Sequence, residues 1–386
     1  MKLLIHDLNE FEWAKVADNY NGWEVISNNG NISPCGGCFG CWLKEPGRCV
    51  IKDGYENIAE MIHKADMVTI ISRYSYGGFG SFIKTVVDRS IGYVLPLFEI
   101  YNDEMHHKPR YPEYKPVKFI FRANEFTEDD KVKARRYVES VCANFRAVIR
   151  DIVFEECDLQ DDEKIEGIHF CNQGDPNRKL LLNCSLKGDK ANSKKFLKHL
   201  ANGIKGDREI VNLSQYVNDM DELAKIVAGA GVIVLGIPLY VDGIPSSTLR
   251  FMELVEELKI TDDKKIYVVC NNGFYESQQN KNLISMVRTW CQRCGYKYCG
   301  SVSIGAGELT GPKIKAGAKG KGPAKNVASS LSRLAKAINA DISAEDLLAE
   351  PNNVPRSLYM FMGNLGMRMT AKTNGVRRKD FYKRWD

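Results

Sequence analysis

Four cysteines gather in one short stretch of this 386-residue chain, S-P-C-G-G-C-F-G-C-W-L-K-E-P-G-R-C-V-I-K-D, residues 33–53. Cys35, Cys38 and Cys41 follow the spacing C-x2-C-x2-C, and Cys49 comes after a further seven residues that include a Pro-Gly turn signal. Thiolates from one tight loop can surround a compact metal centre, and ferredoxin-type ligand runs begin with the same spacing. The pattern therefore makes these four thiols candidate ligands of a 4Fe-4S cluster.

The sequence leaves two alternatives open for this loop, a zinc site and thiols without a metal. Zinc ribbons tend to use two separated C-x2-C pairs, so the arrangement suits zinc less well. The thiols can also be buried or redox-active without any metal. A disulfide framework is not expected, because the N-terminal residues turn polar too early for a signal peptide and therefore predict a cytoplasmic, reducing location.

A second stretch with chemical potential follows residues 179–184 and reads S-L-K-G-D-K-A-N-S-K-K-F. It combines Ser185 and Lys187 with Asn192 or Ser193 as a natural N-cap of an amphipathic helix. Backbone N–H groups and small hydroxyls at a helix start bind anions, so the stretch predicts a phosphate site. An ordinary capped turn is the alternative.

Apolar, β-branched runs alternate with amphipathic segments in two similar series along the chain. The runs predict strands at 2–6, 23–27, 67–72, 117–121 and 147–154, and again at 179–184, 208–213, 231–237, 264–270 and 296–304. This alternation predicts an α/β fold with two flavodoxin-like, doubly wound, five-stranded parallel sheets in tandem. We expect one domain at 1–157 and a second at 178–386, which carries a C-terminal extension, with a linker near 158–178.

A partial internal repeat supports the duplication. Residues 67–89 and 231–253 both contain an apolar strand, a Tyr/Gly loop, a serine and a helix with an early basic residue. Ligands of doubly wound sheets bind at the carboxyl ends of the strands. The loops that follow the predicted strands are therefore the expected location of a site.

The second half resembles the NADPH-dependent FMN reductase and flavodoxin-like quinone reductase families. Ser185 matches the serine of their first loop, Lys187 stands where arginine is common, and Asn192-Ser193 match the closing Asn-Thr. Cys184 replaces the usual glycine, which removes backbone freedom from the turn. The resemblance implies that this loop binds the phosphate of FMN.

The same resemblance implies two further flavin-binding loops. Residues 238–246, P-L-Y-V-D-G-I-P-S, would border the isoalloxazine ring, and residues 271–276, N-N-G-F-Y-E, would approach its pyrimidine edge. The cofactor-binding residues expected in all three loops are Ser185, Lys187, Asn192, Ser193, Pro238, Leu239, Tyr240, Asp242, Gly243, Asn271, Asn272, Gly273 and Phe274.

The first half is expected to lack this phosphate site. Its equivalent loop carries Asp7, Glu10 and Glu12, whose carboxylates would repel a phosphate. Residues 72–90 resemble the iron-sulfur flavoprotein family in the positions of a lysine and an Asp-Arg pair, although Arg73 replaces that family's proline. The cysteine loop resembles the same family in spacing, which implies a cluster near a flavin. More widely, the first half is similar to flavodoxin-family oxidoreductases of anaerobes.

Three further segments receive structural interpretations. Cys291 and Cys294 form C-x-x-C at the end of a predicted helix, where a thiolate is disfavoured. Residues 305–325, rich in Gly, Lys and Ala, are interpreted as a mobile loop followed by a flexible flap over the cofactor. His106 and His107 are expected on a surface loop, with proton donation or anion binding as the alternative.

The composition excludes several function classes. The longest apolar run, 232–241, is too short to cross a bilayer and contains both Gly and Pro. The net charge of +5 comes with no nucleic-acid-binding motif, so the basic residues late in the chain predict a solvated surface or a contact with an acidic partner or phosphorylated cofactor. We expect no nucleic-acid or membrane partner, and a homo-oligomer.

These features together predict an FMN-dependent oxidoreductase, or iron-sulfur flavoprotein, that passes electrons from NAD(P)H or a ferredoxin to an acceptor that the residues do not identify. The alternatives are a non-catalytic flavodoxin-like electron carrier and a structural or interaction protein without cofactors.

Overall fold

The computed structural model describes residues 1–159, 174–260 and 263–385. By packing, the chain divides into two compact units, of which the first comprises Met1–Lys164 with Met360–Asp386 and the second comprises Ile165–Tyr359. In the described part of the chain, no helix combines the length and the apolar character needed to cross a membrane.

The first unit is built on a parallel sheet with the strand order β2-β1-β3-β7-β8. Numbered within the unit, this is the order 2-1-3-4-5 of flavodoxin-like folds. Its strands are β1 (Lys2–His6), β2 (Glu24–Ile26), β3 (Met67–Ser75), β4 (Gly78–Phe79), β7 (Lys115–Ala123) and β8 (Ala147–Glu156), with the short β4 antiparallel to β3. Its helices are α1 (Glu10–Val16), α2 (Gly40–Leu43), α3 (Ile58–Lys64), α4 (Ser81–Arg89) and α5 (Glu128–Phe145).

Both faces of this sheet are covered, as a parallel sheet requires. On one face Leu4 and Ile120 pack with Trp13, which follows β1. On the other face Phe119 lines a small apolar cavity with Val86 of α4 and other aliphatic side chains. Because successive strand residues point to opposite faces, the continuous apolar runs in the sequence are the signature of this two-sided burial.

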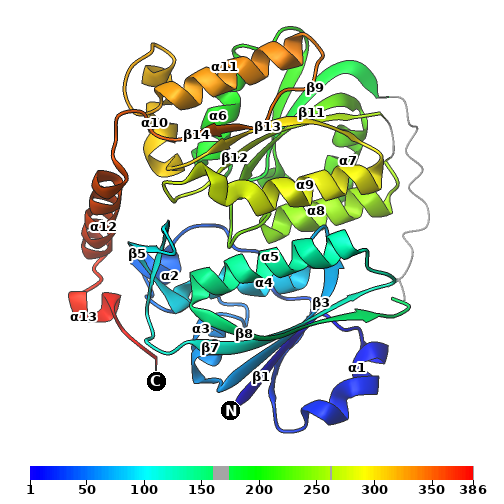
Figure 1. Cartoon of the computed structure of the whole chain (residues 1–386), viewed down its shortest axis with the longest axis vertical. Helices are drawn as coiled ribbons and strands as arrows, with labels where there is room; N and C mark the ends of the chain where they lie inside the picture. The colour runs from blue at the N-terminus through cyan, green and yellow to red at the C-terminus, as the bar shows by residue number, and fades with distance from the viewer. Residues whose placement is uncertain (160–173, 261–262, 386) are drawn as a thin grey trace. The chain divides into compact units, whose positions relative to one another are not determined.

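The second unit repeats the arrangement with the order β10-β9-β11-β12-β13-β14. Its strands are β9 (Asp175–Asn183), β10 (Arg208–Asn212), β11 (Ala230–Pro238), β12 (Lys265–Asn271), β13 (Lys297–Ile304) and β14 (Leu347–Ala349). Its helices are α6 (Asn192–Ala201), α7 (Met220–Ala228), α8 (Ser246–Glu257), α9 (Lys281–Cys294), α10 (Gly307–Gly317) and α11 (Lys325–Asn339). Figure 1 shows α6, α10 and α11 on one face of the sheet and α7, α8 and α9 on the other.

All ten strands expected from the sequence are present, and the tandem flavodoxin-like fold is confirmed by the strand order of both sheets. The two repeated segments form β3 with α4 and β11 with α8, in the same position of each sheet. The expectation for residues 305–325 was wrong in part, because 307–317 form α10, which packs on α6. The linker expected near 158–178 falls largely outside the described residues.

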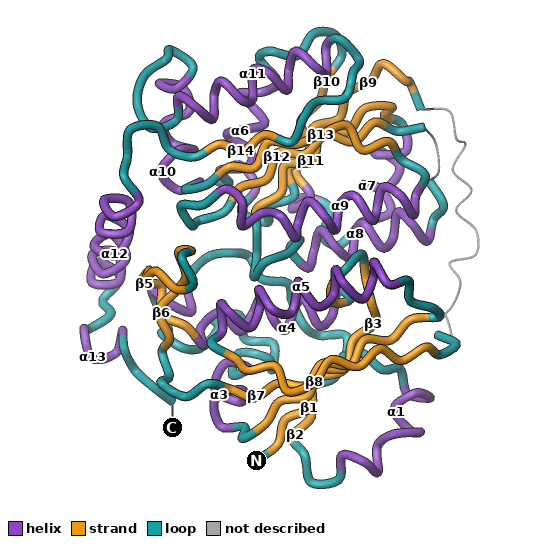
Figure 2. The backbone as a smooth tube through the Cα atoms, viewed as in Figure 1, coloured by secondary structure: helices purple, strands orange, loops and turns teal. Residues whose placement is uncertain are grey.

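A hairpin that the sequence did not predict lies outside the first sheet. Strands β5 (Val94–Tyr101) and β6 (Glu104–Pro109) form a separate antiparallel pair (Figure 2). His106 and His107 therefore lie on a strand and not on a surface loop. His107 is half-buried, and its ring lies 4.7 Å from the ring of Trp42 and 5.3 Å from that of Phe98.

The C-terminal segment packs on this hairpin. Helix α12 (Arg356–Thr373) continues from the second unit into the first and is followed by α13 (Arg378–Phe381). The side-chain amide of Asn364 accepts from the backbone N–H of Phe98 (2.6 Å) and donates to its carbonyl (3.0 Å). Residues 360–386 thus belong to the first unit, whereas the sequence had placed them in a domain at 178–386. The difference arises because an exposed strand edge needs hydrogen-bond partners, which a distant segment supplies.

Acid is expected to weaken the first unit through His107. Burial lowers the pKa of this ring to about 3, and His106 acts in the same direction, whereas an unfolded histidine titrates near 6.5. The folded state therefore binds fewer protons, so the contribution to stability is fully present above pH 6.5 and is lost as the pH falls toward 3. Between pH 6.5 and 5 the free energy of unfolding should fall by about 2 kcal/mol through this group.

Urea denaturation of the wild type and His107→Gln at these two pH values measures this term. The variant should keep only the remaining slope, to which His6 contributes because burial lowers its pKa to about 4. Identical pH dependence in both proteins would contradict the assignment.

Candidate functional site

The candidate site of the second unit lies at the carboxyl edge of its sheet. Strands β9, β11 and β12 run parallel, so the loops that follow them emerge side by side. The backbone joins the loops directly: the N–H of Cys184 donates to the carbonyl of Gly236 (2.9 Å), and the N–H of Leu239 donates to the carbonyl of Asn271 (2.8 Å). The structure therefore brings the three segments chosen from the sequence to one edge.

The first loop is held by its own polar side chains. The Ser185 hydroxyl accepts from the backbone N–H of Lys187 (3.3 Å) and is almost fully buried. Asn183, at the end of β9, donates to the carbonyl of Gly188 (3.1 Å) and accepts from the hydroxyl of Ser193 (2.7 Å). These bonds fix the backbone of the loop. They do not involve the backbone N–H groups of Asn192 and Ser193 at the start of α6.

Helix α6 begins differently from the sequence expectation. Asn192 and Ser193 are its first two residues and not its N-cap; that position is taken by Ala191, which provides no side-chain hydrogen bond. The first amides of a helix have no partner within the helix. An uncapped start of this kind, with the positive end of the helix dipole, is suited to an anion.

Two lysine side chains, Lys187 and Lys194, lie at the first loop. Lys194 is committed to Asp189 (2.7 Å) and to the side chain of Asn212 (2.9 Å). Lys187 lies 4.0 Å from the exposed Glu308. The substitution of glycine by Cys184 does not strain the turn, because positive φ occurs at Gly188 and not at Cys184.

The second loop is a tight reverse turn under backbone strain. Tyr240 and Gly243 exchange two backbone hydrogen bonds, of 3.1 and 3.0 Å. The two residues between them have positive φ, 37° at Val241 and 60° at Asp242. A β-branched residue in this region is a true outlier, and such strain is concentrated at binding sites. Tyr240 and the preceding Pro238 and Leu239 are half-buried beside this turn.

The third loop offers buried acceptor atoms. The side-chain oxygens of Asn271 and Asn272 are buried and have no hydrogen-bond partner among the described residues. The amide of Asn272 donates to the carbonyl of Glu276 (3.0 Å), which holds the side chain in place. Gly273 is exposed, and its carbonyl accepts from the hydroxyl of Tyr359 (2.6 Å), while Phe274 next to it is half-buried. Buried unpaired oxygens need a donor, which a ligand can supply.

The corresponding edge of the first sheet is closed by its own carboxylate. The backbone N–H of Arg73 donates to both oxygens of Asp7, at 3.0 and 2.9 Å, and the Ser72 hydroxyl lies 3.4 Å from the same group. A proline at position 73 could not make these bonds, because it has no N–H. The two departures from the family pattern, Asp7 and Arg73, therefore form a matched pair that occupies this edge.

The four cysteines of residues 33–53 lie in the first unit, two of them in or beside α2. Cys41 is buried on α2, and Cys38 is exposed, with its sulfur accepting from the N–H of Gly40 (3.4 Å). Burial raises the pKa of Cys35 to about 12, and Asp88, Cys49 and Cys38 raise it further. Burial likewise raises the pKa of Cys41, and all three other thiols add to this shift.

The four thiols share one short loop, yet they are not arranged as ligands. Within the described ranges, no three or more His, Cys, Asp or Glu side chains are placed to hold a metal ion. Four thiols are a suitable donor set for a thiolate-bound metal. The conformation of the loop, however, does not bring them into a ligand arrangement.

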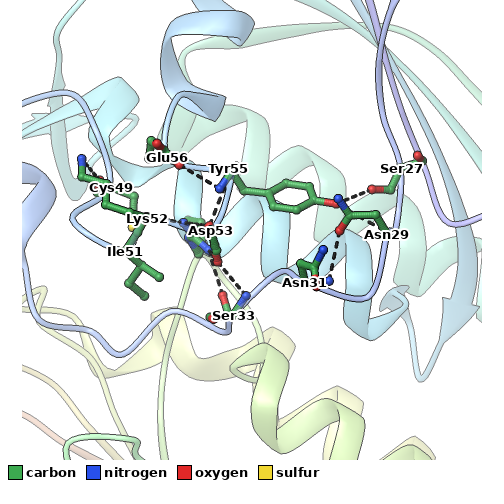
Figure 3. Close-up of polar contacts among 12 residues, drawn as sticks. Ser27, Asn29, Asn31, Ser33, Cys49, Ile51, Lys52, Asp53, Tyr55 and Glu56 are labelled. Atoms are coloured by element: carbon green, nitrogen blue, oxygen red, sulfur yellow. Dashed lines mark hydrogen bonds and ion pairs between the residues drawn. The ribbon is translucent and has the colours of Figure 1, made fainter.

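One ion pair and two hydrogen bonds fix the loop to helix α4. The guanidinium of Arg89 pairs with the carboxylate of Asp53 and donates to the carbonyls of Ser33 (3.1 Å) and Ile51 (3.2 Å). The N–H of Ser33 donates back to Asp53 (2.9 Å) (Figure 3). Both ends of the loop are thus tied to one buried arginine. The sequence marked Arg89 only as part of an Asp-Arg pair, which was the available signal for this role.

Comparisons with known proteins add little to this description. Neither the family models nor the curated protein sequences contain a match. An FMN-dependent NADH-azoreductase from Bacillus anthracis is 15% identical, with a TM-score of 0.32 over 42% of this chain and all of that one. The Trp repressor binding protein of Bacillus subtilis is 16% identical, with a TM-score of 0.28 over 33% of this chain and 84% of that one.

A rubredoxin oxygen:oxidoreductase from Desulfovibrio gigas is 8% identical, with a TM-score of 0.28 over 53% of this chain and 37% of that one. At this level of similarity the fold assignment rests on the strand order of the two sheets.

Relief of the strain at Val241 should stabilise the second unit. Asparagine tolerates positive φ far better than valine, so Val241→Asn is expected to raise the free energy of unfolding by about 1 kcal/mol. Thermal denaturation of the ligand-free protein measures the gain. Val241→Thr keeps the β-branch and serves as the control, with no gain expected. Equal stability of the two variants would show that the turn is not strained.

Proposed function

We propose that this chain is an FMN-dependent oxidoreductase whose flavin binds at the carboxyl edge of the second sheet. One observation carries the proposal: three loops meet at this edge, and the first of them leads into the uncapped start of α6. A dianionic phosphate is the ligand that such a helix start suits best.

The residues of the three loops suit the parts of the cofactor. The amides of Asn192 and Ser193, with Ser185 and Lys187, would hold the phosphate. Tyr240 in the strained turn would border the ring, and the unpaired oxygens of Asn271 and Asn272 would accept from its polar edge. When bound, the flavin supplies hydride and single-electron transfer.

The chain's own residues would then position the flavin and exclude water. The turn between Tyr240 and Gly243 is closed by its two backbone hydrogen bonds, so it presents a fixed wall. Asp242 is buried within that turn. Electrons would enter from NAD(P)H or a ferredoxin.

The proposal includes a metal centre in the first unit. Cys35, Cys38, Cys41 and Cys49 would ligate a 4Fe-4S cluster, which supplies one-electron transfer when present. Support comes from the sequence, in which the four thiols lie within one short loop with the spacing of ferredoxin-type ligands. In the described part of the chain the four side chains are not arranged as a ligand set, so binding of a cluster would require the loop to rearrange.

If the first loop binds the phosphate of FMN, a reversed charge in this loop should weaken the binding of FMN and not that of riboflavin. Lys187→Glu should weaken FMN binding to the apoprotein by about tenfold or more, because a carboxylate would face a dianion. Binding of riboflavin, which lacks the phosphate, should change by less than about twofold. Quenching of flavin fluorescence gives both dissociation constants.

Lys190→Glu is the matched control, since Lys190 is an exposed residue of the same loop. Equal effects of the two variants, or equal effects on FMN and riboflavin, would show that the phosphate does not bind at this loop. Wild-type protein that binds neither flavin would end the proposal and leave a protein without a flavin cofactor.

The cluster assignment predicts that iron depends on the loop and flavin does not. Protein purified without oxygen should contain iron and sulfide, and Cys38→Ser should abolish both while leaving flavin binding unchanged. Cys157→Ser, outside the loop in the same unit, should retain the iron. Iron content unaffected by Cys38→Ser would reject the ligand set, and zinc in place of iron would change the metal.

A further inference from the structure

The last residues of the chain contact the four-cysteine loop. The indole N–H of Trp385 donates to the carbonyl of Pro46 (2.9 Å). The guanidinium of Arg48 stacks on the same ring, 3.6 Å from its centroid. Both contacts fall on the turn between Cys41 and Cys49. A segment more than three hundred residues away in sequence therefore packs on the part of the loop that separates two of the candidate ligands.

The fit between Trp385 and this turn is close. Gly47 has a φ of +92°, and a Cβ at this position would lie 2.4 Å from the indole nitrogen. The N–H of Gly47 donates to the carbonyl of Cys41 (2.9 Å). The conformation of the turn and the position of the ring are thus coupled through a residue that can only be glycine.

A buried arginine holds the tail in place. Arg110 is 3% exposed, and its guanidinium donates to the carbonyls of Phe381 (3.2 Å), Lys383 (2.9 Å) and Gly92 (2.8 Å). In return, the guanidinium of Arg384 donates to the carbonyl of Arg110 (3.0 Å). The tail backbone is therefore fixed on both sides of Tyr382.

The same arginine lies close to the cysteine loop. Gly92, which accepts from Arg110, packs so tightly on Gly47 that a Cβ would approach its backbone to 3.0 Å. The remaining amino group of Arg110, Nη2, is buried without a hydrogen-bond partner among the described residues. A buried cation favours negative charge nearby, and Cys41 is one of the groups that interact with this guanidinium electrostatically.

We propose that the end of the C-terminal tail, residues 383–385, is part of the four-cysteine site, and that Trp385 and Arg110 are positioning residues for its thiols. Trp385 holds the turn at 46–48, and this turn sets the separation of Cys41 and Cys49. Arg110 holds the tail and places a positive charge beside the thiol cluster. Groups of this kind, one layer outside the ligands, orient metal-binding loops in many proteins.

The inference rests on the proposed function only where it treats the thiols as ligands. The contact between tail and loop is tested without any metal. The rate of alkylation of each cysteine is measured by mass spectrometry on reduced, metal-free protein. In Trp385→Ala, Cys41 and Cys49 should react about tenfold faster, because the turn that covers them is released.

Two further variants make the result specific. Trp385→Phe keeps an aromatic ring for Arg48 but loses the indole N–H, so its rates should lie between those of the wild type and Trp385→Ala. Tyr382→Ala is the matched control, since its ring packs on Phe381 and its hydroxyl meets Arg368. This variant should leave Cys41 and Cys49 within about twofold of the wild type. Cys142, buried in α5, reports on unfolding of the whole unit.

Two outcomes would overturn the proposal. In the first, Trp385→Ala reacts like the wild type. In the second, Cys142 accelerates as much as Cys41 and Cys49, which would make the tail a general support of the first unit.

A Co2+ titration separates this inference from the proposed metal centre. Thiolate-to-metal charge-transfer absorbance should appear on addition of Co2+ to the wild type, and Trp385→Ala and Arg110→Lys should each weaken the apparent affinity by about tenfold. Wild type that gives no such band would refute the metal centre, while the alkylation rates would still decide the role of the tail. Affinities unchanged in both variants would overturn the positioning role.

Discussion

Parallel strands in one sheet all end at the same edge, and this constraint governs the chemistry of the chain. In both units the order 2-1-3-4-5 brings the loop after the first strand beside the loop after the third. Backbone N–H groups at such an edge point away from the sheet and need partners. The first unit supplies such a partner itself, whereas the start of α6 in the second unit has no side-chain cap.

The first unit satisfies this edge internally. Asp7 accepts two hydrogen bonds from the Arg73 amide, so a carboxylate of the chain occupies the place where an external anion would otherwise bind. The second unit leaves the start of α6 uncapped, and two of its asparagine side-chain oxygens are buried with no hydrogen-bond partner in the described part of the chain. The chain thus has one closed edge and one open edge, and only the open edge supports a proposal of cofactor binding.

The first unit, whose sheet edge is closed, uses two buried arginines to hold its four-cysteine loop and the C-terminal tail. Arg89 ties both ends of the cysteine loop to α4 through Asp53 and two carbonyls. Arg110 ties the C-terminal tail to the same region through three carbonyls. A guanidinium is suited to this task because its planar array of donors satisfies several backbone oxygens at once. Arg110 also opposes the rise in the pKa of Cys41, although burial and the neighbouring thiols keep that pKa raised.

The sequence alone determined the two sheets, because apolar β-branched runs such as 231–237 have no stable place except between two layers of helices. It also indicated which loops meet, since five alternating strands in a domain of this length are typical of flavodoxin-like sheets, and the structure has that strand order. Only the tertiary structure decided the first residue of α6, because the turn at Gly188 uses Asn183 and moves Ala191 into the N-cap position. Tertiary packing likewise made residues 307–317 a helix despite Pro312, and it placed His107 on a hairpin strand against Trp42. The contact of Trp385 with Pro46 had no local signal, because hydrogen bonds and ring contacts between segments so distant in sequence depend on the folded arrangement of everything between them.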